Sequence, residues 1–396
     1  MKEKIQYGKQ NINKDDIKSV TKCLKQDLLT TGPQVKKFEN KIEDKLGCKY
    51  AVTCNNGTSG LHLALKAIGT KKNDVILMPS INFIASFNMT NEIGARSYLV
   101  DIDANTGQMT EQTILECIKK NKIKKIKAII TMYLGGYVTN NIKFYLLKKK
   151  LKCFLIEDAC HALGAKYQFE KKKISIGSCR HSDVAVFSFH PVKSITTGEG
   201  GVVTTNSKNI FQKLKNFKNH GIIRKKNKYW SYDIKSSGYN YRLSDINCSL
   251  GISQLNRLDS FILKRKKIFS YYQQKLKNYK NIATLINNHN PYNAYHLIIL
   301  NINFKILNSN KEKLFSFLNR KSIYPQFHYI PIYKFSFCSQ KYNAKHFKGS
   351  EQYYKSCISL PVYYSLTKKQ IFFIMDKILE FINSRLANKK FSKSIF

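Results

Sequence analysis

The 396-residue sequence contains no uninterrupted apolar run of the roughly 18 residues that a membrane-spanning helix needs. No apolar segment follows residues 1–5 either, so the sequence predicts no signal peptide. Ten cysteines are present, but they form no Cys-x-x-Cys pair and no Cys/His cluster at metal-ligand spacing. These absences argue against a membrane protein, a disulfide framework and a zinc site. We therefore expect a cytoplasmic protein without a metal site.

Acidic residues are also scarce: 25 Asp and Glu stand against 68 Lys and Arg, a formal net charge of +43. Such an excess can indicate binding to nucleic acid or to another anionic surface. It can also be compositional, because lysine is accompanied here by abundant asparagine and isoleucine, as AT-rich codons would produce. The lysines are spread along the chain in short runs, which favours the compositional interpretation. We expect no specific nucleic-acid partner, although a positive field would favour anionic substrates at low salt.

A single lysine, Lys193, stands in the loop between two apolar, strand-like segments, residues 184–189 and 202–205. The loop also contains three glycines and two threonines and shows no helical periodicity. We expect Lys193 to lie at the edge of a sheet, close to buried apolar side chains. Desolvation disfavours the charged form and lowers the pKa, which is what an amine needs in order to attack an aldehyde. The alternative is an ordinary surface lysine in a lysine-rich chain.

Apolar segments alternate with helical stretches over residues 75–156. Strands of this kind with helical crossovers predict an α/β fold with a largely parallel sheet covered on both faces. Ligands bind beyond the carboxyl ends of the strands in such sheets. The polar or aromatic residues that follow those ends are therefore candidates for a binding site: Ser80, Phe83, Asp158, His161, Ser188 and Lys193.

Asp158 directly follows one of these apolar segments, residues 153–156. A carboxylate at the end of a buried strand is costly unless a cation pairs with it. A protonated pyridine nitrogen would do so, and a lysine that forms an imine together with such an aspartate is the recurring arrangement around pyridoxal phosphate. An aspartate that only caps the following helix is the alternative.

Gly57, Thr58 and Ser59 form a small polar turn between a short strand and a helix. Free backbone N–H groups and the positive end of the helix dipole suit a phosphate at this position. Ordinary N-capping by Thr or Ser explains the turn equally well. No Gly-Lys-Ser or Gly-Lys-Thr follows, so the turn is not a Walker loop.

Two domains are expected from the length and from a change of pattern near residue 258. Residues 1–258 would form the large cofactor-binding domain together with the N-terminal segment. Residues 259–396 would form a smaller α+β domain, with a strand over 294–302 and a last helix over 368–381. The polar tail from residue 388 is expected to fray.

Several of these segments, namely residues 55–61, 79–85, 156–164 and 238–245, together with the lysine loop, carry a family resemblance. Over residues 5–380 the sequence resembles the DegT/StrS-type sugar-nucleotide aminotransferases, most closely their branch in pseudaminic acid biosynthesis. The resemblance implies the aspartate-aminotransferase-like fold type I of pyridoxal phosphate enzymes. That fold has a large domain around a mostly parallel mixed sheet and a smaller C-terminal α+β domain.

The resemblance also implies roles for residues around the cofactor ring. Lys193 would bind the cofactor covalently and later carry a proton between cofactor and substrate carbons. Asp158 would pair with the ring nitrogen, and His161 would sit beside the ring oxygen or beside Asp158. Phe83 would stack on the ring.

Other residues would hold the rest of the cofactor and the substrate. Asn240 would reach the cofactor phosphate from the neighbouring subunit, which implies a homodimer with shared active sites. His328 and Tyr329 would line the sugar-nucleotide site. The phosphate itself would be held by Gly57, Thr58, Ser59 and Ser188.

The implied reaction moves the amino group of L-glutamate to C4 of a UDP-linked 4-keto-6-deoxy-N-acetylhexosamine, giving UDP-4-amino-4,6-dideoxy-N-acetyl-β-L-altrosamine. Another 4-keto sugar nucleotide, of the perosamine or arabinose type, is an alternative substrate. A non-catalytic relative that uses its charge to hold nucleic acid is an alternative of another class, but it leaves Lys193 and Asp158 unexplained. The sequence departs modestly from the family pattern at Asn56, Gly60 and Cys160, and its turn at residues 134–136 is looser than usual.

Overall fold

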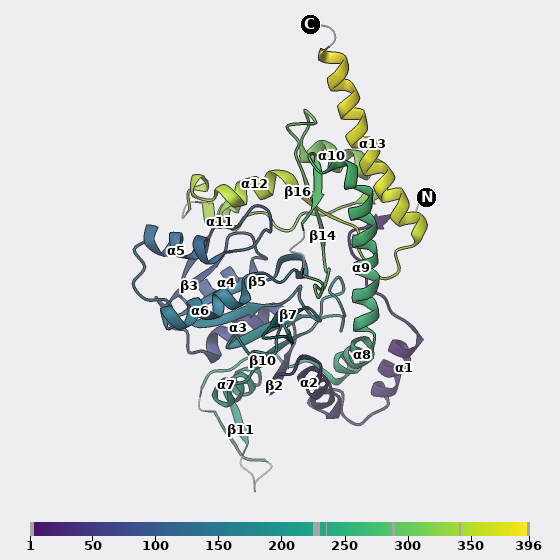
Figure 1. The fold of residues 1–396 in the computed structure, drawn as a ribbon. Helices are drawn as coiled ribbons and strands as arrows, with labels where there is room; N and C mark the ends of the chain where they lie inside the picture. The colour runs from purple at the N-terminus through teal and green to yellow at the C-terminus, as the bar shows by residue number, and fades with distance from the viewer. Residues whose placement is uncertain (1–3, 225–229, 235, 287–289, 340–341, 394–396) are drawn as a thin grey trace.

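A seven-stranded sheet forms the centre of the molecule in this computed structural model, which describes residues 4–224, 230–234, 236–286, 290–339 and 342–393 (Figure 1). The strand order is β2-β10-β9-β6-β5-β3-β4. Every neighbouring pair from β4 to β9 is parallel, and β10 runs antiparallel to both β9 and β2. The predicted mostly parallel mixed sheet is therefore confirmed. The strands are β2 (Tyr50–Cys54), β3 (Val75–Pro79), β4 (Arg96–Val100), β5 (Ala128–Met132), β6 (Phe154–Asp158), β9 (Val184–Ser188) and β10 (Gly201–Thr205).

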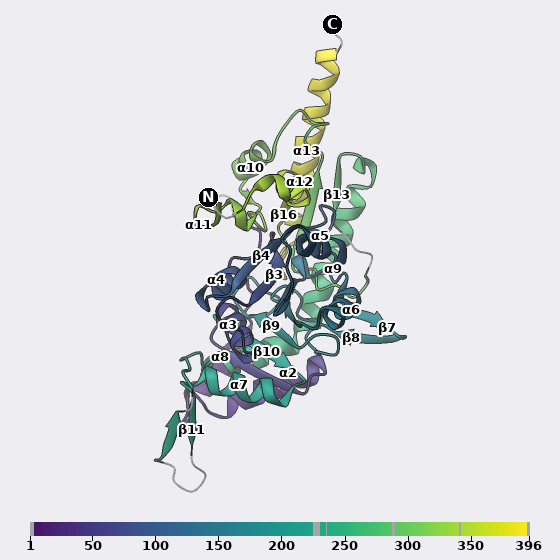
Figure 2. The ribbon, with the colours of Figure 1, turned by 90° about the vertical axis from the view of Figure 1, so that its left-hand side faces the viewer.

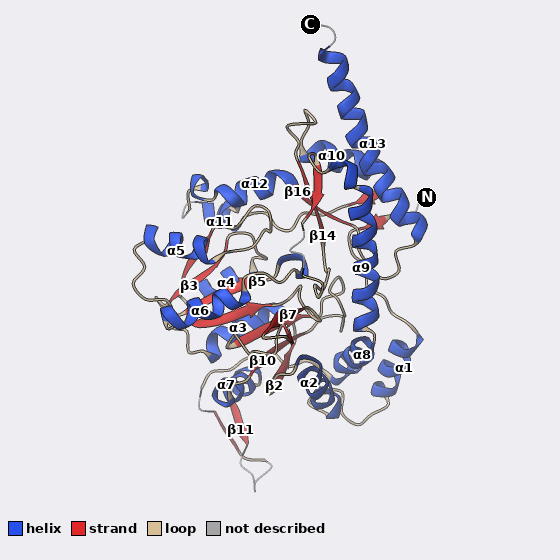
Figure 3. Cartoon of the chain, viewed as in Figure 1, coloured by secondary structure: helices blue, strands red, loops and turns tan. Residues whose placement is uncertain are grey.

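Helices cover both faces of this sheet, as Figures 2 and 3 show. Alternate side chains of β9 point to opposite faces, because successive residues of a strand alternate. Val186 packs in one core with Leu61 of α3, and Phe187 packs in another with Phe38 of α2. Burial on both faces explains why the strands read as nearly continuous apolar runs. The helices of this part are α1 (Lys14–Leu24), α2 (Pro33–Leu46), α3 (Gly57–Ala67), α4 (Ala85–Glu92), α5 (Glu111–Lys120), α6 (Asn141–Leu151), α7 (Lys208–Lys218) and α8 (Asp245–Asn256).

The start of α8 anchors the start of a second helix that is distant in sequence. Ser244 caps α8, because its side chain accepts a hydrogen bond from the backbone N–H of Asn247. Asp245 instead turns its buried carboxylate to α2, where it accepts hydrogen bonds from the backbone N–H groups of Gly32 (2.8 Å) and Gln34 (2.7 Å). A negative charge is favourable there because it meets the positive end of the α2 dipole.

The C-terminal part builds a three-stranded antiparallel sheet, β13-β14-β16, with its own core. The predicted strand over 294–302 is shorter, because β14 begins at residue 298. The last helix, yellow in Figure 1, continues to Lys393 instead of fraying from residue 388. Its final segment contains no Gly or Pro to end the helix. The elements are α9 (Leu258–Lys275), β13 (Ala283–Leu285), β14 (Ile298–Ile302), α10 (Lys311–Arg320), α11 (Ser336–Ser339), α12 (Lys348–Ser356), β16 (Cys357–Leu360) and α13 (Lys368–Lys393).

Short elements complete the fold. Two hairpins leave the large sheet: one is formed by β7 (Lys166–Phe169) and β8 (Lys172–Ser175), the other by β11 (Ile222–Arg224) and β12 (Tyr232–Ile234). Single 3-10 turns lie at Leu134–Gly136, Lys277–Tyr279, Ile332–Lys334 and Ala344–His346. Among the described residues, no helix is both long and apolar enough to cross a membrane.

The N-terminal segment joins the C-terminal part in a two-stranded parallel sheet. β1 (Ile5–Gln6) pairs with β15 (Ile323–Tyr324), so the N-terminal segment is fastened to the C-terminal part. A second link is Asp101, after β4, which accepts hydrogen bonds from the N–H groups of Gly349 and Ser350 (both 2.9 Å) at the start of α12. The predicted boundary at residue 258 coincides with the junction of α8 and α9, and it stays a prediction.

Candidate active site

A cavity of about 480 Å³ opens at the carboxyl edge of the large sheet. β2, β5, β6 and β9 all end at its wall, because a residue at or just after the end of each strand lines it. Parallel strands bring their carboxyl ends to one edge, so residues far apart in sequence converge here. The predicted site residues that line the cavity are Gly57, Thr58, Phe83, Asp158, His161, Ser188, Lys193, His328 and Tyr329.

Three of the residues that the sequence analysis named, Ser59, Ser80 and Asn240, do not line this cavity. Ser80 is fully buried, and its hydroxyl oxygen lies 2.6 Å from that of Ser350, so its candidacy for the binding site was wrong. The backbone N–H of Ser59 donates to the cap residue Asn56 (2.8 Å), and its hydroxyl donates to Asn55 (2.5 Å). Capping therefore explains Ser59, while the turn still presents Gly57 and Thr58 to the cavity. Asn240 is exposed on the outside of the subunit. The roles implied for Ser59 and Asn240 stay predictions.

Lys193 reaches the cavity from a tight turn after β9. Its backbone N–H donates to the carbonyl of His190 (2.9 Å), and that of Thr197 donates to the carbonyl of Phe189 (3.0 Å). Burial lowers the pKa of Lys193, and the nearby Cys160 and Asp158 oppose that shift. Within the described part of the chain, the ammonium forms no salt bridge. The amine therefore remains available to a bound molecule, as the sequence predicts.

Asp158 ends β6, and only 3% of its surface is exposed. Burial raises the pKa of its carboxyl group, while hydrogen bonds to Cys160, the charge of Lys193 and a hydrogen bond to Asn82 act against the shift. The backbone donor, the N–H of Cys160, is 3.3 Å from Oδ1. A buried carboxylate with such weak donors is favourable only when a cationic or N–H-bearing partner enters the cavity.

Three histidines, His161, His296 and His328, pack together beside the cavity. The ring of His161 lies 4.3 Å from that of His296 and 6.3 Å from that of His328, measured between centroids. Nδ1 of His328 is 2.9 Å from Oγ of Ser359. Burial, reinforced by the charge of Lys193, lowers the pKa of all three, to about 3 for His328.

The cavity also has walls that the sequence did not reveal. Tyr7 lines it because the pairing of β1 with β15 brings the N-terminal segment across; its ring is 5.1 Å from that of His328. No local pattern predicts such a long-range contact. His190 and Glu199 also line it, and their places inside the lysine loop could have indicated them.

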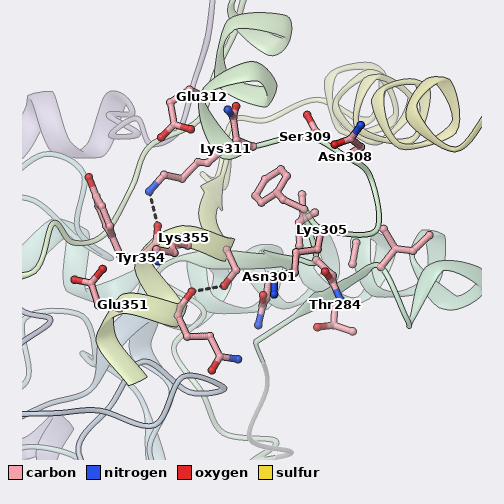
Figure 4. Close-up of a pocket in the computed structure, with 18 of the residues that line it drawn as sticks. Thr284, Asn301, Lys305, Asn308, Ser309, Lys311, Glu312, Glu351, Tyr354 and Lys355 are labelled. Atoms are coloured by element: carbon pink, nitrogen blue, oxygen red, sulfur yellow. Dashed lines mark hydrogen bonds between the residues drawn. The ribbon is translucent and has the colours of Figure 1, made fainter. Parts of the chain in front are cut away.

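A larger groove, of about 1160 Å³, lies between α10, α12 and the edge strand β13 (Figure 4). Its most buried cation, Lys311, has its Nζ 4.1 Å from the Phe327 ring and 3.7 Å from the Tyr354 ring. The same Nζ donates to the carbonyl of Tyr354. This amine is already engaged, and Asp158 and Lys193 lie elsewhere. The candidate active site is therefore the smaller cavity.

The buried His328 has a predictable effect on stability. It remains neutral in the folded chain below the usual histidine pKa of about 6.5, whereas the unfolded chain takes up a proton. Its contribution to the free energy of unfolding is therefore present above about pH 6.5 and is lost as the pH falls, by up to ~1.4 kcal/mol per pH unit. Urea unfolding between about pH 7 and about pH 5 should show a shallower pH dependence for His328→Asn than for the unaltered chain.

The same substitution at the exposed His346 is the matched control. Identical slopes for His328→Asn and the unaltered chain would mean that the pKa of His328 is the same in the folded and the unfolded protein.

Comparison with known proteins shows the family of this chain. The model of the DegT/DnrJ/EryC1/StrS aminotransferase family matches residues 10–379. The UDP-4-amino-4,6-dideoxy-N-acetyl-beta-L-altrosamine transaminase of Campylobacter jejuni is 36% identical over 378 residues, covering 96% of this chain and 97% of that protein. The GDP-perosamine synthase of Escherichia coli O157:H7 is 32% identical over 371 residues, covering 92% of this chain and 95% of that one.

A solved structure shows the same fold. Helicobacter pylori PseC, an aminotransferase involved in the biosynthesis of pseudoaminic acid, superimposes with a TM-score of 0.87 at 28% sequence identity. The match covers 96% of this chain and 100% of that one. The fold, the residues at the sheet edge and the full-length family match lead to one conclusion: the chain belongs to the DegT/DnrJ/EryC1/StrS aminotransferase family.

Proposed function

We propose that this aminotransferase uses pyridoxal phosphate to move the amino group of L-glutamate to C4 of a UDP-linked 4-keto-6-deoxy-N-acetylhexosamine. The product would be UDP-4-amino-4,6-dideoxy-N-acetyl-β-L-altrosamine. The observation that carries the proposal is the meeting of the half-buried Lys193 amine and the buried Asp158 carboxyl group in one cavity. The named substrate is supported by the similarity to the C. jejuni transaminase.

The residues present fit this cofactor. The α3 turn offers the backbone N–H groups of Gly57 and Thr58 to a phosphate at the N-terminus of an eleven-residue helix, and Ser188 adds a hydroxyl. A Cβ on Gly57 would come within 2.9 Å of Cβ of Ser188, so glycine lets the turn approach β9 closely. The Asp158 carboxylate accepts a long hydrogen bond from the backbone N–H of Cys160 (3.3 Å). A protonated pyridine nitrogen would be a suitable cationic partner for it.

Each residue would have a distinct task. When bound, the cofactor supplies an electron sink for the carbon next to the reacting amine. Lys193 would hold the cofactor through its amine and, once released by the incoming amino group, would move a proton between the two reacting carbons. Asp158 would keep the ring nitrogen protonated. Phe83, whose side chain is more than half exposed, would cover the ring.

The substrate proposal has one direct test. Purified protein with glutamate is incubated with a panel of UDP-, GDP- and dTDP-linked 4-keto sugars, and the products are read by mass and by NMR at C4. We expect amination of the UDP-linked N-acetylhexosamine. Preference for the GDP sugar would instead support a perosamine-type substrate, which the 32% identity to the E. coli GDP-perosamine synthase makes the second candidate.

Lys193→Ala should abolish both turnover and the visible absorbance of the bound cofactor, because no other amine of the described chain lines the cavity. The measurements are the absorbance spectrum after incubation with pyridoxal phosphate and the rate of product formation. Lys150→Ala, an exposed lysine on α6, is the matched control and should retain both. A Lys193→Ala variant that keeps its spectrum and its rate would remove Lys193 from the mechanism.

We also propose a homodimer with shared active sites, in which Asn240 reaches the partner's cofactor phosphate. Among the described residues that line the cavity, Lys193 is the one lysine or arginine, so a phosphate and a diphosphate lack cationic partners within one subunit. The β11–β12 hairpin, which projects from the body in Figure 1 just before Asn240, exposes 66% of Trp230 and 56% of Tyr232. An exposed apolar surface of this kind suits an interface.

Mixing two inactive variants tests the shared site. Lys193→Ala and Asn240→Ala would each damage a different half of every site, so mixed dimers should regain up to about half of the activity of one intact site pair. The readout is product formation after mixing and subunit exchange. Mixtures that stay as inactive as their components, with exchange confirmed by mass, would contradict the shared arrangement.

We place the reaction in the cytoplasm. No disulfide joins any of the ten cysteines, which all lie in the described part of the chain, and every one except Cys160 is buried. Ten cysteines without a disulfide are typical of a reducing compartment.

A further inference from the structure

A chain of three groups joins the turn after β5 to the cavity. The backbone N–H of Gly135 donates to Nδ1 of His161 over 3.3 Å. Nε2 of the same ring lies 3.0 Å from the hydroxyl oxygen of Tyr329. Tyr329 also lines the cavity, so it is the last of the three groups.

The first contact decides where the proton of His161 lies. A backbone N–H can only donate, so Nδ1 must be an unprotonated acceptor. A cationic imidazole carries hydrogen on both nitrogens and could not accept there, so the ring is neutral and carries its single hydrogen on Nε2. Burial and the charge of Lys193 lower the pKa of His161, which agrees with a neutral ring.

The second contact then has a fixed direction. Nε2–H of His161 donates, and the hydroxyl oxygen of Tyr329 accepts. The hydroxyl hydrogen of Tyr329 is therefore left over, and within the described part of the chain no second partner takes it. Burial raises the pKa of Tyr329 well above its usual value, so this hydrogen is retained across the working pH range.

The two glycines of the turn make the arrangement possible. Gly135 and Gly136 both have left-handed backbone angles, with φ of +70° and +81°. A Cβ on Gly136 would come within 2.5 Å of the carbonyl oxygen of His161, and one on Gly135 within 2.8 Å of the Tyr137 ring. Only glycine lets this turn press against the histidine so that its amide reaches the ring. The loose turn noted in the sequence thus has a physical role.

We propose that Gly135, His161 and Tyr329 form a one-way hydrogen-bond relay that makes Tyr329 a donor to an acceptor oxygen of the molecule held beside Lys193. His161 is the positioning residue and Tyr329 the contacting one. Two sources offer such an oxygen: the phenolic oxygen on the pyridine ring and the carbonyl oxygen of the 4-keto sugar. The relay deepens the proposed function and rests on it for the identity of these sources.

The tautomer can be tested without any cofactor. In the protein freed of cofactor and labelled with ¹⁵N-histidine, NMR should show His161 with an unprotonated Nδ1 and a protonated Nε2 that do not change between about pH 6 and about pH 8. A protonated Nδ1, or a ring that becomes cationic in this range, would overturn the relay whatever the enzyme's substrate is.

Tyr329→Phe tests the donor. Loss of one hydrogen bond to a bound oxygen should weaken binding or rate about tenfold. A weaker affinity for pyridoxal phosphate or a shifted cofactor spectrum assigns the oxygen to the cofactor. An unchanged spectrum with a tenfold lower kcat/KM for the keto sugar assigns it to the substrate. Unchanged values in both measurements would overturn the proposal.

Tyr137→Phe is the matched control, because it removes a buried tyrosine hydroxyl that donates to the carbonyl of Leu297 (3.0 Å) and does not line the cavity. It should change stability alone.

Two substitutions of His161 separate positioning from packing. Glutamine can place an N–H where Nε2 stands, whereas asparagine reaches only the position of Nδ1. We expect His161→Gln to keep the spectrum and the kcat/KM close to those of the unaltered chain, and His161→Asn to match Tyr329→Phe. Equal losses in both histidine variants, with Tyr329→Phe unaffected, would overturn the relay. If the unaltered chain itself bound no pyridoxal phosphate, the proposed function would fail, and the tautomer measurement would still stand.

Discussion

The structure depends on the desolvation of ionisable side chains, Lys193, Asp158 and His161, at the carboxyl edge of the large sheet. Desolvation acts on all of them and disfavours the charged form of each. It lowers the pKa of Lys193 and His161 and raises that of Asp158. Desolvated groups of this kind are suited to bind a ligand of complementary charge. Ionisable groups with shifted pKa values cluster at functional sites.

Holding these groups in place requires contacts from distant parts of the chain. Asp245 fixes the start of α2, and Asp101 fixes the start of α12, each through its carboxylate and backbone N–H groups. The pairing of β1 with β15 carries Tyr7 to the cavity. Each contact joins a segment of the N-terminal part to one from later in the chain. The cavity is therefore a property of the assembled fold rather than of any one segment.

The cavity of one subunit supplies polarity but little positive charge. Its walls present histidines, tyrosines and backbone N–H groups, and Lys193 is the one lysine or arginine among the described lining residues. The net charge of +43 is spread over the rest of the surface. A cavity with few cations in a highly charged protein suits a site in which the direction of hydrogen bonds matters more than charge. The fixed tautomer of His161 and the proposed partner residue Asn240 are consistent with it.

The main helices and strands, and many residues of the candidate site, could be predicted from the sequence alone. Apolar strands with helical crossovers predicted the parallel sheet, and the carboxyl-end rule then brought Asp158, Ser188 and Lys193 to one edge. This pattern is local, because the apolar residues of each strand indicate the burial of that strand alone. Lys193 was recognisable because its loop is flanked by two buried strands, β9 and β10.

Tertiary structure decided the rest. Tyr7 and His296 carry no local pattern, and they reach the site only through pairing and packing across long sequence separations. The direction of the hydrogen bond from His161 to Tyr329 required the Gly135 amide at 3.3 Å, which no spacing in the sequence reveals. Local patterns report whether a residue is buried. The proton's position on a ring depends on the partner that faces it, and only the folded chain selects that partner.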